Sequence, residues 1–178
     1  MPEPTTNERV MPNDTHASEQ DRSIPLQTAS DFELANRLFF RLYQCANILH
    51  KVGSRAVEDE GLTTQRWAVM GALSRDDTGV AVGELARYLQ VSRQSLAGVI
   101  GPLVDDGLIA VHTVESDRRS RQYALTERGR RHWHDRALPK IAAFYADATA
   151  GMSIEDMSHA LHYLVRLIEN MNALDERG

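Results

Sequence analysis

Two short amphipathic segments joined by a tight turn strongly limit the folds open to this chain. The first is VGELARYLQ, and the second is SRQSLAGVIGPLVDDG, which begins at Ser92. Apolar residues recur at helical spacing in both segments, and Ser92 is a good helix N-cap. Two helices this short and this closely joined indicate a helix-turn-helix.

A strand-like pair follows the two helices. LIAVHTV and RQYALT are rich in β-branched and apolar residues, and the stretch ESDRRS lies between them. The order strand, tip, strand predicts a β-hairpin. Together with the preceding helices it predicts a winged helix-turn-helix, an α+β lobe within a mainly α fold.

Longer segments with apolar stripes flank this lobe at residues 30–60 and 127–178. SDFE at Ser30 matches a capping box, Thr126 is a candidate cap, and Ser153 stands three residues before an acid. The first segment is apolar over more than one face, which indicates a subunit interface. We expect the lobe at 62–126. Residues 1–29 lack apolar periodicity and are expected to form a disordered tail.

The distribution of charge indicates a DNA-binding surface. The whole chain has a net charge of −5, which does not by itself suggest nucleic-acid binding. Residues 117–136, in contrast, contain seven arginines (118, 119, 121, 128, 130, 131 and 136) and three acids (117, 127 and 135). Because this basic stretch begins on the predicted wing, the sequence predicts double-stranded DNA as the partner.

Small and polar residues occupy the outward side of the second short helix. Such a helix can enter a major groove with its N-terminal end at the base edges. An arginine-rich loop can reach phosphates or a narrow minor groove, and Asp117 would pair with a neighbouring arginine to fix the loop. The predicted DNA-binding residues are Ser92, Arg93, Gln94, Ser95, Ala97, Gly98, Asp117, Arg118, Arg119 and Arg121.

Three stretches resemble the MarR family of bacterial transcriptional regulators: LTTQRWAVMGAL, VGELARYLQVSRQSLAGVIGPLVDDGLI and DRRSRQYALTERG. The family typically shows an Asp-Arg-Arg wing, then Leu-Thr, then Gly. The matching residues here are Asp117, Arg118, Arg119, Leu125, Thr126 and Gly129. A second Asp, a Pro and an Arg often precede this motif. Val114, Glu115 and Ser116 stand there instead, so one wing arginine is missing and Arg121 is the candidate to replace it.

The resemblance covers about Leu34 to Leu174. It implies an obligate homodimer joined by the first and last helices, and a pseudo-palindromic operator read by two recognition helices about one DNA turn apart. It also implies a repressor that a small ligand releases from DNA.

The ligand pocket is expected where the first helix, the TTQRWAVM helix and the wing-to-helix region meet. An aromatic side chain and a cation there suit an aromatic carboxylate or its coenzyme A thioester, as in regulators of aromatic-compound catabolism. Trp67 and Met70 could equally belong to the core. The predicted ligand-binding residues are Tyr43, Asn47, His50, Arg66, Trp67 and Met70.

Two alternative functions remain open at this stage. The protein could be a repressor that senses thiol oxidation through Cys45, although the position of Cys45 in an apolar stripe favours a buried role. A winged helix could also act as a protein–protein adaptor.

Other classes have little support. No glycine-rich phosphate loop, serine elbow or catalytic cysteine pattern is present, so we expect neither an enzyme nor a cofactor. His159 and His162 could share a helix face, but no further ligand completes a metal site. A single cysteine, no signal peptide and no apolar run of spanning length predict a cytoplasmic protein without a membrane partner.

Overall fold

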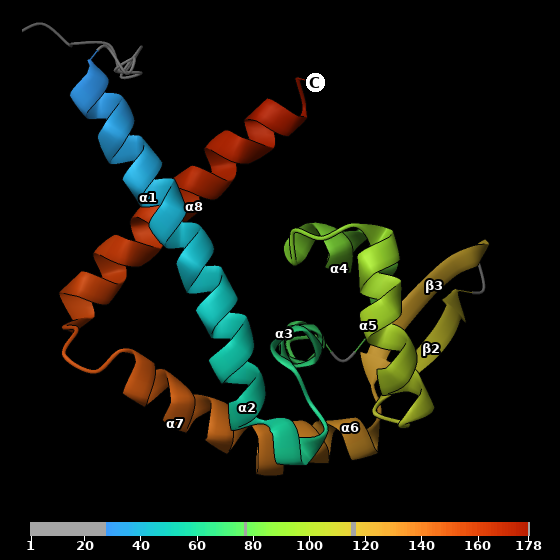
Figure 1. Cartoon of the computed structure of the whole chain (residues 1–178). Coiled ribbons are helices and arrows are strands. Elements are labelled where there is room, and N and C mark those ends of the chain that lie inside the picture. Colours follow the sequence, from blue (N-terminus) through green and yellow to red (C-terminus); the bar gives the residue numbers. More distant parts are fainter. Residues whose placement is uncertain (1–27, 77, 115–116, 178) are drawn as a thin grey trace, which may run out of the picture. The chain divides into compact units, whose positions relative to one another are not determined.

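The computed structural model describes residues 28–76, 78–114 and 117–177, and the side chains at 113–120 lie outside the description. The described chain is mainly helical with one small antiparallel sheet (Figure 1). It divides into two compact units, Met1–Leu42 and Tyr43–Gly178. Of the predicted tail at 1–29, only Thr28 and Ala29 fall within the described residues.

The first unit contains the start of helix α1 (Ala29–Ile48). The Thr28 N–H donates to Asp31 Oδ2, and the Asp31 N–H donates to Thr28 Oγ1, both at 3.1 Å. The predicted capping box at Ser30 is therefore wrong. The cap lies two residues earlier, because the short side chain of Asp31 reaches the backbone of Thr28 directly.

In the second unit the helical path of α1 continues, and a sharp turn then starts the lobe. Gly61 adopts a φ of 68°, and Thr63 caps the next helix by accepting a hydrogen bond from the Arg66 N–H. The elements in this stretch are the π-helical η1 (Leu49–Gly53), α2 (Ser54–Ala56), the 3-10 turn η2 (Glu58–Glu60) and α3 (Thr64–Leu73).

The lobe contains two further short helices and a three-stranded sheet. β3 is the central strand and pairs antiparallel with both others, so Tyr123 lies between Val80 and Val111. The predicted helix pair and hairpin are confirmed, and β1 is a two-residue strand that no sequence pattern indicated. The elements are β1 (Val80–Ala81), α4 (Val82–Tyr88), α5 (Arg93–Asp105), β2 (Ile109–Val114) and β3 (Asp117–Leu125).

One apolar cluster fills the lobe and extends into the helix that follows the wing. Trp133, Ala137 and Ile141 join it from that helix. The lobe and the start of the C-terminal helices therefore share a core. Its largest fully buried side chains are Met70, Leu73, Leu85, Leu96, Leu103, Ile109, Ile141, Val57 and Val69.

The C-terminal helices leave this core and end in a helix with no buried residue. Pro139 lies in the first turn of α7, directly after a π-helical segment. Ser153 and Asp156 form the predicted capping box of α8. None of the helices in the described part of the chain is long and apolar enough to span a membrane. The elements are α6 (Glu127–Arg131), η3 (His132–Ala137), α7 (Leu138–Ala148) and α8 (Ile154–Asp175).

Candidate nucleic-acid interface and adjacent cavity

The turn between α4 and α5 is held in one geometry by backbone and side-chain bonds. Gln90 adopts a φ of 54°, a left-handed conformation that is uncommon for residues other than glycine. The Val91 N–H returns to the Ala86 oxygen at 3.0 Å, and Ser92 Oγ accepts the Ser95 N–H at 3.0 Å. These bonds fix where α5 begins relative to α4.

Helix α5 divides cleanly into a buried and an exposed side. Leu96, Ile100 and Leu103 are buried in the lobe. A Cβ added at Gly98 would meet no atom within 4 Å, so the backbone there is open to close approach. The structure brings six predicted DNA-binding residues together as exposed residues at the N-terminal part of α5: Ser92, Arg93, Gln94, Ser95, Ala97 and Gly98.

The side chain of Arg93 takes a direction that the sequence did not indicate. Its Nη2 lies 3.0 Å from the position that a Cβ on Gly83 of α4 would occupy. In this structure the guanidinium therefore rests across the helix pair rather than projecting straight from α5. The small residue at position 83 makes that placement possible.

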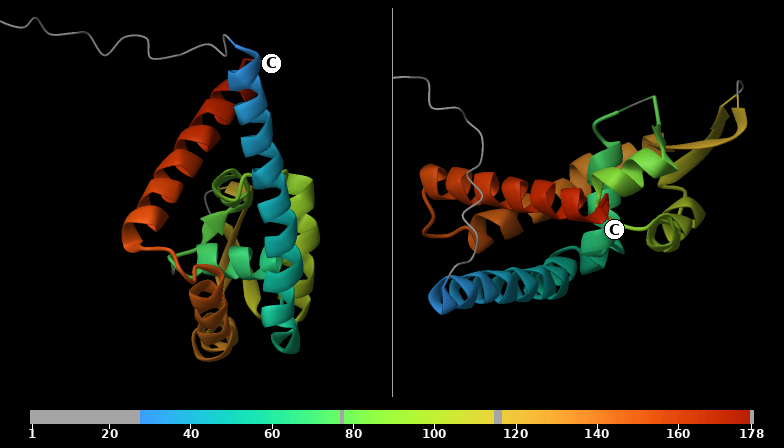
Figure 2. Two further views of the ribbon diagram at one scale, coloured as in Figure 1. Left: turned by 60° about the vertical axis from the view of Figure 1, so that its left-hand side comes forward. Right: turned by 90° about the horizontal axis from the view of Figure 1, so that it is seen from above.

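The wing is the β2–β3 hairpin, which extends beyond the helices of the lobe (Figure 2). Arg121 is exposed and lies opposite Thr113, and the register shifts between Thr113 and Val114. The backbone of Asp117 pairs with Val114. The side chains of Asp117, Arg118 and Arg119 are outside the described residues, and so is the predicted ion pair of Asp117.

The Leu-Thr-x-x-Gly part of the motif joins the wing to α6. The Thr126 N–H donates to the Leu108 oxygen at 3.0 Å, and Thr126 Oγ1 donates to the Gly107 oxygen at 2.8 Å. The same hydroxyl accepts the Gly129 N–H at 2.9 Å, which caps α6 as predicted. The motif therefore anchors the base of the wing, while the arginines lie farther along the hairpin.

Ion pairs within the chain reduce the basic surface after the wing. Arg130 Nε lies 3.6 Å from Glu127 Oε2, and Arg131 Nη1 lies 3.1 Å from Glu127 Oε1. Arg136 Nε lies 2.7 Å from Oε2 of Glu60, an acid that lies outside residues 117–136. Three of the four arginines that follow Arg121 in this stretch are therefore paired with acids.

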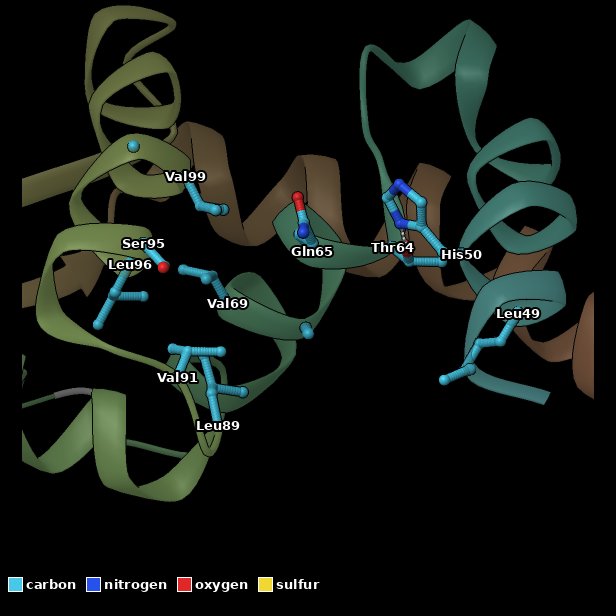
Figure 3. Close-up of a pocket in the computed structure, with 13 residues that line it drawn as sticks. Leu49, His50, Thr64, Gln65, Val69, Leu89, Val91, Ser95, Leu96 and Val99 are labelled. Carbon is cyan, nitrogen blue, oxygen red and sulfur yellow. Dashed lines mark hydrogen bonds between the residues drawn. The ribbon is translucent and has the colours of Figure 1, made fainter. Parts of the chain in front are cut away.

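A cavity of about 730 Å³ lies beside the recognition helix α5. In Figure 3, Leu49 and His50 lie on one side, Thr64 and Gln65 on α3 lie between, and the α5 residues lie opposite. The cavity is lined by Ala46, Leu49, His50, Thr64, Gln65, Ala68, Val69, Leu89, Val91, Ser95, Leu96, Gly98 and Val99.

Hydrogen bonds order the polar end of this cavity. His50 Nδ1 and Thr64 Oγ1 are 2.8 Å apart, and the Thr64 N–H donates to Ser54 Oγ at 3.1 Å. Gly53 allows η1 to approach α3 here, since a Cβ on it would lie 2.7 Å from Thr64 Cγ2. Among the described residues that line the cavity, none is Asp, Glu, Lys or Arg.

Of the six predicted ligand-binding residues, only His50 lines this cavity. Trp67 and Met70 belong to the core, with 7% and 0% exposed, which is the alternative that the sequence left open. Arg66 donates to the Gly61 oxygen at 2.8 Å. The remaining two, Tyr43 and Asn47, are exposed on α1.

The lining residues that sequence reasoning missed follow a detectable spacing. Thr64 and Ala68 are four residues apart on α3, and Ser95 and Val99 are four apart on α5. Residues four apart lie on the same side of a helix, here at or next to its buried residues. The side of α3 with Thr64 and Ala68 faces the side of α5 with Ser95 and Val99 across the cavity. Searching for two such helix sides would have located the cavity better than searching for an aromatic residue near a cation.

The thiol and the histidine pair can also be placed. Cys45 is exposed on α1, so the expected buried role is wrong within this chain, because the stripe that contains it does not face the core. His159 and His162 are exposed on α8. Within the described ranges, no three His, Cys, Asp or Glu residues cluster as a metal site requires.

Comparisons with known proteins agree with this geometry. Residues 60–120 match the model of the MarR family. BadR of Rhodopseudomonas palustris, a transcriptional activatory protein, is 58% identical over 159 residues, which cover 87% of this chain and 91% of BadR.

Solved structures share the fold. The M. tuberculosis regulator MosR in complex with DNA aligns with a TM-score of 0.67 at 24% identity, over 76% of this chain and 96% of MosR. CouR from Rhodococcus jostii RHA1, bound to p-coumaroyl-CoA, aligns with a TM-score of 0.66 at 22% identity, over 74% of this chain and 91% of CouR.

An exposed recognition helix beside an arginine-bearing wing defines a DNA-binding transcriptional regulator of the winged helix-turn-helix class, not an enzyme. The chain belongs to the MarR family.

Proposed function

We propose that the protein is a homodimer whose affinity for operator DNA is changed by a small acyl ligand in the cavity beside α5. The observation that carries the proposal is that one cavity is bounded by η1, α3 and the recognition helix. Ser95 and Gly98 belong both to the cavity lining and to the predicted DNA contacts. A ligand that favours one position of α5 would therefore change how α5 fits the groove.

The chemistry of the lining favours a neutral acyl group over a free carboxylate. The polar lining side chains are those of His50, Thr64, Gln65 and Ser95, and the rest of the lining is apolar or glycine. An ionised carboxylate against this lining would lose part of its hydration and gain no opposite charge. A thioester has no such charge. We therefore propose an aromatic acyl-coenzyme A rather than the free acid, a class to which the p-coumaroyl-CoA bound to CouR belongs.

The proposed homodimer rests on the apolar side chains that α1 and α8 each expose. On α8, Ile154 is 80% exposed and Leu161 is 64% exposed, and on α1 Leu34 is 66% exposed. Large apolar side chains repeatedly exposed along one helix favour an interaction site on that helix. A second copy of the chain would cover both helices and place two recognition helices on one DNA molecule.

Each copy would then contact one half of a pseudo-palindromic operator, with the half-sites about one DNA turn apart. We propose that the exposed end of α5 reads the major groove through Ser92, Arg93, Gln94, Ser95, Ala97 and Gly98. The wing would contact phosphates or the minor groove through Arg118, Arg119 and Arg121, with Asp117 shaping the tip.

The direction of regulation is a separate part of the proposal. The family resemblance implies a repressor, whereas BadR, at 58% identity, is named an activatory protein. We propose activation, because the resemblance to BadR extends over most of both chains. A reporter gene under the cognate promoter tests this, since deleting the regulator should lower expression if it activates and raise it if it represses.

Fluorescence anisotropy with labelled DNA from upstream of the gene tests the ligand. We expect benzoyl-CoA or p-coumaroyl-CoA to change the Kd for DNA by about tenfold, a coupling of about 1.4 kcal/mol. Benzoate and free coenzyme A are the controls and should have little effect. An equal effect of benzoate would contradict the argument for an uncharged acyl group in the cavity, and no effect of either thioester would contradict the proposed ligand class.

The same assay separates the two alternative functions. If peroxide abolishes DNA binding by the wild type but not by Cys45→Ser, the protein senses thiol oxidation instead. DNA binding should weaken steeply as salt rises, because counterions are released from the phosphates. A protein adaptor would bind no duplex even at low salt.

A further inference from the structure

Two stretches of chain connect the lobe to the helices proposed to form the dimer. One passes through α2 and η2 into α3, and the other leaves through η3 and α7 toward α8. Helix α2 packs against α7, so the two connections are neighbours (Figure 1). Buried Val57, Leu62, Ala137 and Ile141 already join the two stretches through the shared apolar core. Polar contacts between the stretches add to this core in limiting how the lobe can tilt.

A buried carboxylate lies at this junction. The Glu60 side chain, at the end of η2, is only 4% exposed. Arg136 Nε lies 2.7 Å from Glu60 Oε2, an ion pair without hydrogen-bond alignment, and Lys140 Nζ lies 2.7 Å from Glu60 Oε1. Lys140 also pairs with Asp59. We refer to Asp59, Glu60, Arg136 and Lys140 as the junction cluster.

Hydrogen bonds within the junction cluster shift the pKa values of two of its members, Lys140 and Asp59. The hydrogen bonds of Lys140 to Asp59 and Glu60 raise the pKa of the Lys140 ammonium, and the bond from Lys140 lowers the pKa of the Asp59 carboxyl. Buried ion pairs often add little net stability compared with apolar residues of similar volume. They can still favour one arrangement over others, because an arrangement that moves the cations away while Glu60 stays buried leaves its carboxylate unpaired.

We propose that Glu60, held by Arg136 and Lys140, fixes the orientation of the DNA-binding lobe and thereby sets the operator half-site spacing that the dimer accepts. Glu60 is a positioning residue, since it belongs neither to the cavity lining nor to the predicted DNA contacts. The inference rests on the proposed homodimer, because spacing has meaning only when two lobes bind together.

Selection from a randomised duplex library tests this inference with the full-length wild type, Glu60→Gln and Glu58→Gln. Glu58 is the matched control: it is an exposed acid on the same turn and takes part in none of the ion pairs described above. Wild type and Glu58→Gln should select the same half-sites at one spacing. Glu60→Gln should select the same half-site sequence but accept neighbouring spacings. It should also bind the wild-type site about tenfold more weakly, because the lobe then samples several orientations instead of one preorganised orientation.

A purely structural role for Glu60 would lower the thermal midpoint without changing the selected spacing, and that result overturns the inference. Arg136→Gln covers the case in which Glu60→Gln does not fold, because the Arg136 side chain is 61% exposed and its loss leaves Lys140 on Glu60. It should broaden the spacing less than Glu60→Gln does, and wild-type spacing in a folded Arg136→Gln would then count against the proposal. A wild-type selection without paired half-sites would remove the proposed dimer, and this inference with it.

Discussion

At Gly129 a Cβ atom would lie 2.0 Å from the backbone oxygen of Leu108, far inside any nonbonded contact. That oxygen also accepts the Thr126 N–H, so it cannot move away without breaking the bond between the wing base and α6. Gly129 is not among the glycines with positive φ. The motif therefore needs glycine here for close approach, not for backbone freedom.

Replacing Gly129 with Ala should lower the free energy of unfolding by at least about 1–3 kcal/mol, because the added methyl group forces backbone to shift. Urea denaturation measures this. Gly98→Ala is the matched control: the space around Gly98 is open and it lies inside α5, so alanine should stabilise the chain by about 0.5–1 kcal/mol. Equal effects at the two positions would contradict the close-approach argument.

At the scale of elements, local chemistry made much of the fold predictable. Ser92, Thr126 and Ser153 each cap a helix through an N–H three residues on, and such caps can be read directly from sequence. The apolar runs of β2 and β3 likewise predicted the hairpin. Ser30 failed because a competing cap, Thr28 with Asp31, stood two residues earlier.

The candidate site was less predictable, because it depends on how distant segments meet. His50 reaches Thr64 only because Gly53 lets η1 approach α3, and no local pattern encodes that contact. Cys45 is exposed because α1 has no buried residue in this chain, which its apolar stripe did not indicate. By contrast, the outward residues at the start of α5 follow from its own periodicity, so they were found.

The cap of α8 should be sensitive to acid. The Ser153 N–H donates to Asp156 Oδ2 at 2.8 Å, and this bond, with a second from the Ser153 hydroxyl at 2.7 Å, lowers the pKa of the Asp156 carboxyl. A carboxyl whose pKa is lower in the folded state stabilises that state above its unfolded pKa, and this contribution disappears as the pH falls through the folded pKa.

We therefore expect the thermal midpoint of the wild type to exceed that of Asp156→Asn at neutral pH, and the difference to vanish well below the ordinary pKa of 3.8. Circular dichroism at a series of pH values measures both midpoints. Glu155→Gln, an acid beside the cap that makes neither of these bonds, should show a much smaller difference. A gap between wild type and Asp156→Asn that is constant across the series would exclude the titration of Asp156 as its cause.

For the wing, we predict that Arg119→Ala weakens operator binding and lowers the slope of log K against log salt by about one, as loss of one phosphate contact requires. Arg131→Ala is the control, because Arg131 is already paired with Glu127 on α6. Anisotropy titrations at several salt concentrations give both slopes. Unchanged affinity in Arg119→Ala would remove the wing from the proposed interface.

At the scale of the whole molecule, a net charge of −5 is compatible with DNA binding because the charges are segregated. Acids such as Glu60 and Glu127 pair with arginines away from the hairpin, and the exposed end of α5 carries no acid between Ser92 and Gly98. An overall acidic protein can therefore present a local basic surface to phosphates.

Leu164→Asp should convert the proposed dimer to a monomer, because a charge in a dimer interface would be buried without a partner. Leu164 is 42% exposed in the single chain, so the monomer itself can tolerate the change. Sedimentation velocity at micromolar concentration measures the state of assembly. Asn170→Asp adds the same charge to the same helix at a polar position and should remain dimeric. A persisting Leu164→Asp dimer would place the interface elsewhere.

Ser95 and Gly98 face the cavity and also stand on the exposed end of α5. If the proposed DNA contacts and effector cavity are correct, a change at either position would alter the operator preference and the effector preference together. Gln94 and Ala97 stand on α5 without lining the cavity, so they could change the operator preference and leave the effector preference intact. Substitutions at Gln94 and Ala97 are therefore the better choice for changing the operator of this regulator while its effector stays the same.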